Sequence, residues 1–414
     1  MRLIERKKLV LFGAGKIGRS FIAQLFSRGG YEVVFVDISR TLIDELNRRK
    51  EYRVVIKGEK EQVLKINNVR GVILSDEKKV SDEVATAGIV ATSVGLAGLA
   101  GVFPVLAKGI LKRSKDPVHP VDIIIAENMR NADFYFREQL KTFLPPGFPI
   151  DSLVGLVETS IGKMVPIMTK KDIEEDMLQI FAEPYNTLIL NRNGFKNPIP
   201  EIAGLAPKEH MKPWVDRKLF IHNLGHSSAA FAGHCFNPDF IYMHEVLAVP
   251  VIFEFTRCTM QQASAILLRE YPDEFTPEDL NDHIDDLLER FRNKFLGDTV
   301  FRVGCDLPRK LGPEDRLAGA IKKAFEMKLP YESILFSLVC GSWFRAVDED
   351  GNMLKNDISF AATRSRGIHH VLSDVCRFDK VRHKDIFDKA LIFDSRLSNR
   401  KGDILSAFPT TMTK

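Results

Sequence analysis

The sequence predicts an α/β amino-terminal domain with a doubly wound, mainly parallel sheet, followed by a mainly α-helical domain. Three observations support this fold class. Short apolar runs alternate with amphipathic segments in the first half of the 414 residues, and a glycine-rich turn directly follows the first apolar run. Helical spacing without convincing strand alternation fills the second half.

Four short runs rich in apolar residues are typical of buried parallel strands, at residues 9–12, 32–36, 89–92 and 122–126. Residues 52–66 break this rhythm, because they alternate around Lys57 and Gly58 in the manner of an inserted hairpin. We expect this hairpin at the edge of the sheet or over a bound cofactor.

A cluster of prolines and glycines between residues 195 and 214 predicts the domain boundary. We therefore expect a first domain at 1–205 and a second at 206–414. Beyond the cluster, helical spacing predicts helices at residues 215–236, 248–271, 277–295, 314–327 and 331–347.

The composition excludes several classes of protein. The net charge is only +4, and Lys and Arg form no long block, so nucleic acid is not an expected partner. The five cysteines lie far apart and form no C-x-x-C pair, which argues against a disulfide framework or a thiolate zinc site. The charged amino terminus and the absence of a ~20-residue apolar stretch predict a cytoplasmic protein without a membrane segment.

The glycine-rich turn has the spacing of a dinucleotide-binding motif. Gly13, Gly15 and Gly18, with Lys16 and Ile17 between them, follow a strand and open a helix, as in the Rossmann fold. Gly13 permits the tight turn, Gly15 lets a pyrophosphate approach the backbone, and Gly18 lets helix and strand pack closely. The helix amino terminus then faces the phosphate charge.

Asp37 follows the second strand, where a carboxylate can accept hydrogen bonds from the ribose hydroxyls of the cofactor. The same carboxylate would repel a 2′-phosphate, so we expect NAD rather than NADP. Arg19 and Arg40 are near enough in sequence to leave NADP open.

Two further strand ends carry candidate cofactor contacts. Ser93 and Val94 end the third buried strand, and Asn128 follows the next one. Because strand carboxyl ends face the ligand crevice of a doubly wound sheet, these residues are placed to line the nicotinamide end. Their alternative role is a turn or a helix cap.

Oxidation of an alcohol needs a base for the hydroxyl proton and donors that polarise the oxygen. No tyrosine is followed by a lysine four residues later, which removes one standard solution. Lys218, His226 and Asn223 stand at roughly 0°, 80° and 140° on one side of a predicted helix. Lys218 can be the base if burial or a cationic neighbour such as Arg217 lowers its pKa.

Two alternatives remain at this segment. Lys218 can be a surface lysine, with Asn223 as a helix cap and His226 hydrogen-bonded in the core. His222 and His226 have the spacing of a metal pair, but no nearby carboxylate completes it, so no metal site is expected. Gly225, which costs a helix roughly 1 kcal/mol against Ala, suggests the close approach of another group.

The chain resembles the polyol-specific long-chain dehydrogenases, the mannitol dehydrogenase family, and most closely the branch that uses phosphorylated polyols. The resemblance covers almost the whole chain. It is carried by FGAGKIGRSFI (12–22), ATSVG (91–95), AENM (126–129), GLVETSIGKMVP (155–166), DRKLFIHNLGHSSAA (216–230) and RVGCDLPRKLGPEDRLAGA (302–320).

The resemblance implies a zinc-independent NAD enzyme in which Lys218 is the general base and Asn223 and His226 bind the reacting oxygen. In the phosphate-using branch the reaction interconverts mannitol 1-phosphate and fructose 6-phosphate. The matching basic segment contains candidate phosphate ligands, and Asn128 is a further substrate candidate. The basic candidates are Arg302, Arg309, Lys310 and Arg316, although one or two of them can instead pair with neighbouring carboxylates.

One departure concerns the substrate. Where relatives read V-D-R-I-V-P, residues 161–166 read I-G-K-M-V-P, so Gly162 replaces a carboxylate, and only Glu158 is near in sequence. Three alternatives therefore stay open: a dehydrogenase of an unphosphorylated polyol or hexuronate, a non-catalytic NADH-binding protein, and a β-hydroxyacid dehydrogenase. The last would place Asn four residues after its Lys, where this chain has His222. The oligomeric state, monomer or homodimer, is not determined by the sequence.

Overall fold

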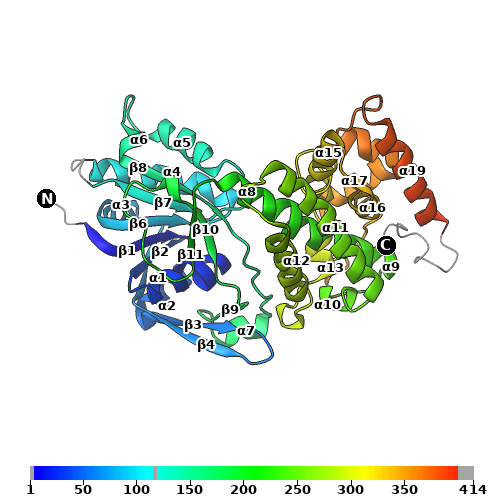
Figure 1. Ribbon diagram of the computed structural model, residues 1–414. Coiled ribbons are helices and arrows are strands. Elements are labelled where there is room, and N and C mark those ends of the chain that lie inside the picture. The colour runs from blue at the N-terminus through cyan, green and yellow to red at the C-terminus, as the bar shows by residue number, and fades with distance from the viewer. Residues whose placement is uncertain (1–3, 115–118, 400–414) are drawn as a thin grey trace. The chain divides into compact units, whose positions relative to one another are not determined.

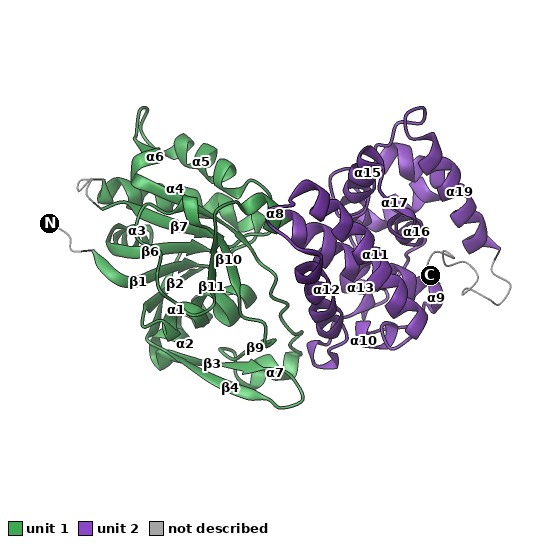
Figure 2. Ribbon diagram, viewed as in Figure 1, with its two compact units in different colours: residues 1–215 green, residues 216–414 purple. Residues whose placement is uncertain are grey.

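The computed structural model describes residues 4–114 and 119–399, which form two compact units, residues 1–215 and 216–414 (Figure 2). The sequence placed the boundary at 205/206, and the units divide ten residues later, within α8 (Met211–Arg217). The reason is β11 (Leu205–Lys208), which pairs in parallel with β10 (Leu188–Asn191) and so keeps this segment in the first unit.

The first unit is built on an eight-stranded sheet within its described residues (Figure 1). Its strand order is β11-β10-β8-β7-β6-β1-β2-β5, and all pairs except β8 with β10 are parallel. The remaining bounds are β1 (Glu5–Phe12), β2 (Glu32–Asp37), β5 (Val69–Ile73), β6 (Ala87–Thr92), β7 (Val121–Ile125) and β8 (Val154–Ser160). The chain order reverses at β1, which lies between β2 and β6, and ligands of such sheets bind at this switch point.

Strand β1 shows why these runs are apolar throughout. Leu9 and Leu11 enter one hydrophobic core, while Val10 and Phe12 enter the core on the opposite face. A parallel sheet covered on both faces needs apolar side chains at every position. The four predicted strands are therefore confirmed, as is the mainly parallel sheet.

Helices cover both faces of the sheet (Figure 1). One face packs against α3 (Glu77–Thr86), α4 (Leu96–Arg113), α5 (Ala132–Phe143) and α6 (Ile150–Leu153). The other packs against η1 (Gly18–Ala23), α1 (Gln24–Arg28) and α2 (Arg40–Arg49). The remaining helical segments of this unit are α7 (Lys170–Glu175) and η2 (Arg192–Gly194).

The predicted hairpin is present but forms its own sheet. Strand β3 (Glu51–Ile56) pairs antiparallel with β4 (Gln62–Asn67) and parallel with β9 (Ile180–Ala182). Of its two expected places, the edge of the main sheet is wrong, because β3 and β4 pair with each other and with β9, and a place over the cofactor stays a prediction. Tyr52 of β3 packs in the core beside Phe35. The Tyr52 hydroxyl also donates to the carbonyl of Arg19, 2.6 Å away.

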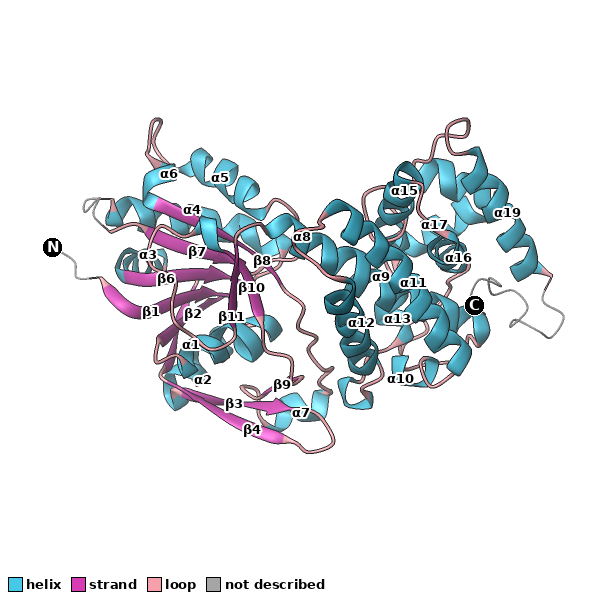
Figure 3. Ribbon diagram, in the orientation of Figure 1, coloured by secondary structure: helices cyan, strands magenta, loops and turns pink. Residues whose placement is uncertain are grey.

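The second unit is largely helical, as predicted. Figure 3 shows how its helices contrast with the mixed strands and helices of the first unit. Its first predicted helix is one continuous helical run from α8 through η3 (Lys218–Asn223) into α9 (Leu224–Phe236). The other helical segments are α10 (Met243–Val246), α11 (Pro250–Glu270), α12 (Pro277–Phe291), η4 (Lys294–Leu296), α13 (Val300–Gly304), α14 (Leu307–Lys310), α15 (Ala318–Met327), α16 (Glu332–Ser342), α17 (Lys355–Ser365), α18 (Ile368–His370), η5 (Val371–Val375) and α19 (Lys384–Ser398). In the parts of the chain that the structure describes, no helix is both long and apolar enough to cross a bilayer.

Asp122 on β7 fastens the proline-rich segment to the sheet. Its carboxylate is 2% exposed and accepts hydrogen bonds from the backbone N–H of Lys196 (2.7 Å) and of Asn197 (3.1 Å). The side-chain amide of Asn197 donates a third bond, 2.8 Å long. Burial raises the pKa of Asp122, although these bonds favour its charged form. Removal of a buried acceptor costs stability chiefly because its donors are left without a hydrogen-bond partner.

We therefore expect Asp122→Ala to lower the free energy of unfolding of the first unit by about 2 kcal/mol, because two backbone N–H groups lose their acceptor. That loss corresponds to a fall of roughly 4–8 °C in its melting temperature. Calorimetry would measure it, with Asp44→Ala on the exposed face of α2 as the control. A melting profile of Asp122→Ala equal to that of the control would contradict this role.

Candidate functional site

The glycine turn between β1 and the following helix has the geometry that a pyrophosphate requires. Gly13 has φ +98°, and a Cβ there would lie 2.3 Å from the Ser93 carbonyl oxygen. A Cβ on Gly18 would lie 2.1 Å from the carbonyl oxygen of Gly13, whereas a Cβ on Gly15 would meet nothing within 4 Å. The helix begins at Lys16, which is exposed, and Ile17 is half-buried. Open backbone at Gly15 next to a helix amino terminus suits a phosphate anion.

Asp37 stands at the end of β2 and holds this turn. Its carboxylate accepts from the backbone N–H of Ala14 (2.7 Å) and from that of Ser39 (2.9 Å). The residue is half-buried, so its carboxylate is both fixed and accessible. This is the position in which an acid recognises ribose hydroxyls in Rossmann domains.

Arg19 is committed to the backbone. Its Nε donates to the carbonyl of Ala14 (2.8 Å), and its Nη1 donates to the carbonyls of Met177 (3.1 Å) and Leu178 (2.8 Å). Its guanidinium thus braces the glycine turn. Of the two arginines that left NADP open, only Arg40, at the start of α2, is exposed.

The end of β6 is organised by Glu127, a residue that the sequence analysis missed. Its buried carboxylate accepts from the backbone N–H groups of Val94 and Gly95, each 2.9 Å away. These groups lie at the amino terminus of α4, which favours a negative charge. Burial nevertheless raises the pKa of Glu127. Ser93 is half-buried beside Gly13, and Asn128 is exposed.

The segment that departs from the family pattern lies near β10. A Cβ at Gly162 would lie 3.5 Å from the hydroxyl oxygen of Tyr185. The next residue, Lys163, is buried and donates to the carbonyls of Glu183 (3.1 Å) and Tyr185 (2.6 Å). Glu158 accepts from the backbone N–H of Ala132 (3.2 Å) at the start of α5. Glu158 therefore serves as a helix cap.

In the second unit, a π turn covers the residues from Lys218 to Asn223. On an α-helix these two side chains would be ~140° apart, since they are separated by five positions. Here the N–H of Leu224 donates to the carbonyl of Leu219, five residues earlier, so the turn is widened by one residue. Lys218 and Asn223 thereby approach the same face of the helix.

Helix α11 packs closely against the same run. A Cβ at Gly225 would lie 2.5 Å from the sulfur of Met260, which confirms the close approach expected there. A larger residue at this position would require the Met260 side chain to move.

Lys218 is half-buried and begins the π turn. Burial, followed by the positive charge of Arg316, lowers the pKa of Lys218 to about 8. From the sequence, Arg217 was the cation expected to lower the pKa of Lys218. In the structure, the cation that lowers it is Arg316. Arg217 instead faces the ring of Phe275.

His226 lies against a carboxylate that the sequence did not reveal. Its Nε2 is 3.0 Å from Oδ2 of Asp298, whose other oxygen binds Arg302. Burial lowers the pKa of His226 more than Asp298 raises it, so the imidazole is neutral near pH 7. Burial raises the pKa of Asp298, but His226 and Arg302 together bring it below its usual value.

His222 does not form the metal pair that its spacing resembles. Its ring packs at 5.5 Å from Phe291, and burial brings the pKa of His222 well below its usual value. Among residues 4–114 and 119–399, no group of three or more His, Cys, Asp and Glu side chains is arranged to hold a metal ion.

The four basic candidates for phosphate binding fall into two classes. The side chains of Arg302 and Arg309 are each 51% exposed, although each pairs with a neighbouring aspartate. Lys310 is buried and donates to the carbonyl of Val303 (2.6 Å), and burial and Arg316 lower the pKa of Lys310 to about 8. Arg316 is also buried. Only the first two present charge to solvent.

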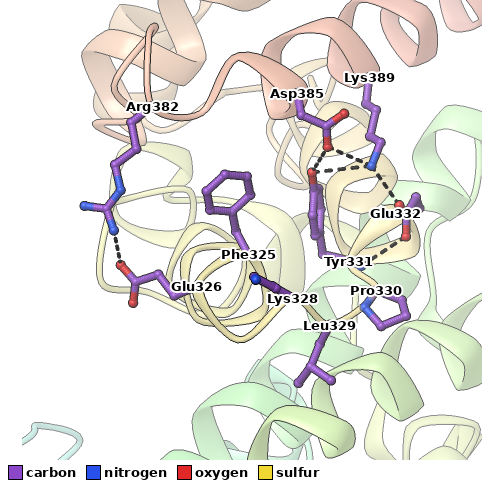
Figure 4. A pocket seen from close by; sticks show the side chains of 10 residues that line it. All are labelled: Phe325, Glu326, Lys328, Leu329, Pro330, Tyr331, Glu332, Arg382, Asp385 and Lys389. Carbon is purple, nitrogen blue, oxygen red and sulfur yellow. Dashed lines mark hydrogen bonds and ion pairs between the residues drawn. The ribbon is translucent and has the colours of Figure 1, made fainter.

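A separate cavity of about 760 Å³ lies among α15, α16 and α19 (Figure 4). Tyr331 donates to Asp385, and Lys389 binds both Asp385 (2.8 Å) and Glu332 (2.9 Å). Arg382 pairs with Glu326 at 3.0 Å. The charged side chains that line this cavity thus pair mainly with one another. None of the residues predicted for catalysis lines it.

Comparison with known proteins agrees with this arrangement. Residues 7–204 match the mannitol dehydrogenase Rossmann domain, and residues 210–391 match the mannitol dehydrogenase C-terminal domain. Mannitol-1-phosphate 5-dehydrogenase of Shouchella clausii is 34% identical over 330 residues, which are 79% of this chain and 86% of that protein. The protein of the same name from Bacillus pumilus is 30% identical over 377 residues, 89% and 95% of the two chains.

Two solved structures share the fold. Substrate-free D-sorbitol dehydrogenase superposes with a TM-score of 0.79 at 16% identity, over 99% of this chain and 100% of the other. Mannitol 2-dehydrogenase of Pseudomonas fluorescens, solved with NAD and D-mannitol, superposes with a TM-score of 0.70 at 14% identity, over 97% and 95% of the two chains. A Rossmann unit, a helical unit and the matching motifs in each show that the chain belongs to the mannitol dehydrogenase family.

Proposed function

We propose that this protein is an NAD-dependent dehydrogenase that interconverts mannitol 1-phosphate and fructose 6-phosphate. One observation carries the proposal: Lys218, with its pKa lowered to about 8, stands on a π turn that brings it toward Asn223, with His226 on the following turn. The names of the two relatives support the substrate.

Oxidation of the alcohol removes two hydrogens, a hydride from carbon and a proton from oxygen, and each needs its own acceptor. NAD, when bound at the glycine turn, supplies the acceptor for the hydride. Lys218 takes the hydroxyl proton when the alcohol is oxidised and returns it when the ketone is reduced. Asn223 donates a hydrogen bond from its side-chain amide to the reacting oxygen. This bond strengthens as that oxygen gains negative charge. His226, which lies beside the carboxylate of Asp298, binds the same reacting oxygen together with Asn223.

The phosphate is assigned to Arg302 and Arg309. Their side chains are half exposed, and a guanidinium can offer two parallel N–H groups to phosphate oxygens. Lys310 and Arg316 are buried, so they are not assigned to the phosphate. The charge of Arg316 acts instead on the amines of Lys218 and Lys310.

Two other functions are distinguished by experiment. Gly162 favours a different substrate, such as an unphosphorylated polyol or a hexuronate, because the family carboxylate is missing there. A protein that binds NADH without turnover is the second. Activity of the purified protein with NADH and fructose 6-phosphate, compared with fructose and hexuronates, separates these functions.

Cofactor choice depends on the charge of Asp37. We expect Asp37→Asn to keep the acceptor for Ala14 but to lose repulsion of a 2′-phosphate, so NADPH binding gains relative to NADH. Asp37→Ala should weaken NADH binding about tenfold, since a charge-assisted hydrogen bond contributes ~1.5–3 kcal/mol. Fluorescence titration with both cofactors measures this, with Asp44→Ala as the control. An unchanged preference in both Asp37 variants would reject the assignment.

The pH dependence follows from Lys218. Because a base must be unprotonated, kcat/KM for polyol oxidation should rise with pH and level off above about 8. Ketose reduction needs the protonated amine, so its rate should fall above the same pH. Lys218→Ala should reduce kcat by roughly 10²–10⁴-fold. Lys212→Ala, an exposed lysine on α8, should keep both profiles. Full activity of Lys218→Ala would exclude the proposed base.

Phosphate recognition is tested at Arg309. We expect Arg309→Ala to raise KM for fructose 6-phosphate about tenfold, the effect of losing one charge-assisted contact, without changing kcat. Arg292→Ala, an exposed arginine that follows α12, is the matched control. Turnover of fructose or a hexuronate in preference to fructose 6-phosphate would show that the substrate carries no phosphate.

A further inference from the structure

Arg316 joins two turns of the helix that carries the proposed catalytic residues. Its side chain is 9% exposed, and its Nη1 donates to the carbonyl of Asn223 (3.3 Å) and to the hydroxyl of Ser227 (3.1 Å). Asn223 ends the π turn, and Ser227 lies one α-helical turn later in α9. The guanidinium therefore bridges the place where the wide turn returns to ordinary helix.

A second nitrogen of the guanidinium, Nε, is held by a carboxylate. Nε of Arg316 donates to Oδ1 of Asp315 (2.8 Å), which also accepts from the backbone N–H of Arg316 (2.7 Å). This pairing orients the planar group, a geometry that a lysine ammonium cannot reproduce. Asp315 also offsets part of the positive charge of Arg316.

Two buried amines lie within the field of Arg316. They are Lys218 on η3 and Lys310 on α14, and the same guanidinium disfavours a charge on both. The other charged groups around Arg316 are Arg309 and Asp306, besides Asp315. On its own helix Lys218 faces His222, which in turn faces His226, Arg290 and His283.

We propose that Arg316 is a positioning residue, which fixes Asn223 at the end of the π turn and sets the positive field in which Lys218 exchanges its proton. This role rests on the proposed function, in which Lys218 and Asn223 act on the substrate oxygen. It departs from the phosphate-binding role that the basic segment suggested for Arg316.

The variants separate charge from geometry. Arg316→Gln removes the charge and should raise the Lys218 pKa by about one pH unit, the size expected for one like charge nearby. Arg316→Lys keeps the charge and loses the fork, so the pKa should stay while kcat falls with little change in KM. Asp315→Asn removes the counter-charge and should shift the Lys218 pKa downward. This opposite sign tests the proposal even where Arg316→Gln does not fold.

The pKa is read without turnover. Competitive acetylation of the full-length protein with acetic anhydride across a pH series, quantified by mass spectrometry, reports Lys218 and Lys310 separately. Arg257→Gln removes an arginine of α11 that is paired with Asp285 of α12, and it should leave the pKa values of both lysines unchanged. Melting curves identify variants that are folded.

The expected result is a parallel upward shift of Lys218 and Lys310 in Arg316→Gln, with the pH–rate profile moved by the same amount. Unshifted lysines in folded Arg316→Gln, or an unshifted Lys218 in Asp315→Asn, would overturn the proposal. Shifted lysines in a protein that oxidises no polyol phosphate would reject the proposed function alone.

Discussion

The polar interior of the second unit depends on one constraint, the burial of the Lys218 amine. Burial of an ammonium costs several kcal/mol unless it is paired or loses its proton. Lys218 meets this constraint by a lowered pKa, and its cationic neighbour Arg316 is itself paired with Asp315. His222 and His226 respond to burial in the same way, by staying neutral. Two other buried charges have partners: Arg316 pairs with Asp315, and Asp298 pairs with the half-exposed Arg302.

The π turn explains a spacing that otherwise counts against the site. An α-helix aligns a Lys with an Asn four residues later, whereas this chain has five. The wide turn absorbs the additional residue, so the two side chains gain the alignment that the shorter spacing would have given. Spacing alone therefore does not separate this chain from a β-hydroxyacid dehydrogenase, and the family match over both units makes that distinction.

Local patterns predicted much of the first unit. Apolar runs identified the central strands because both faces of a parallel sheet are buried, and each motif glycine meets the steric condition assigned to it. Strands β9, β10 and β11 were missed because three or four residues are too few to establish alternation. The edge position of the hairpin was wrong because β3 pairs with β9, a strand distant in sequence. Glu127, Asp298 and Arg316 gained their importance in the same way, from contacts that only the folded chain creates.

The bracing of the glycine turn by Arg19 links two parts of the first unit mechanically. Its guanidinium holds the carbonyls of Ala14, Met177 and Leu178, and its own carbonyl is held by Tyr52 of β3. The small sheet is thus connected to the glycine turn through the side chains of Arg19 and Tyr52. A cofactor that stiffens the glycine turn will also damp the motion of β3 and of the turn before β9, so the cost in conformational entropy extends well beyond the residues that touch it.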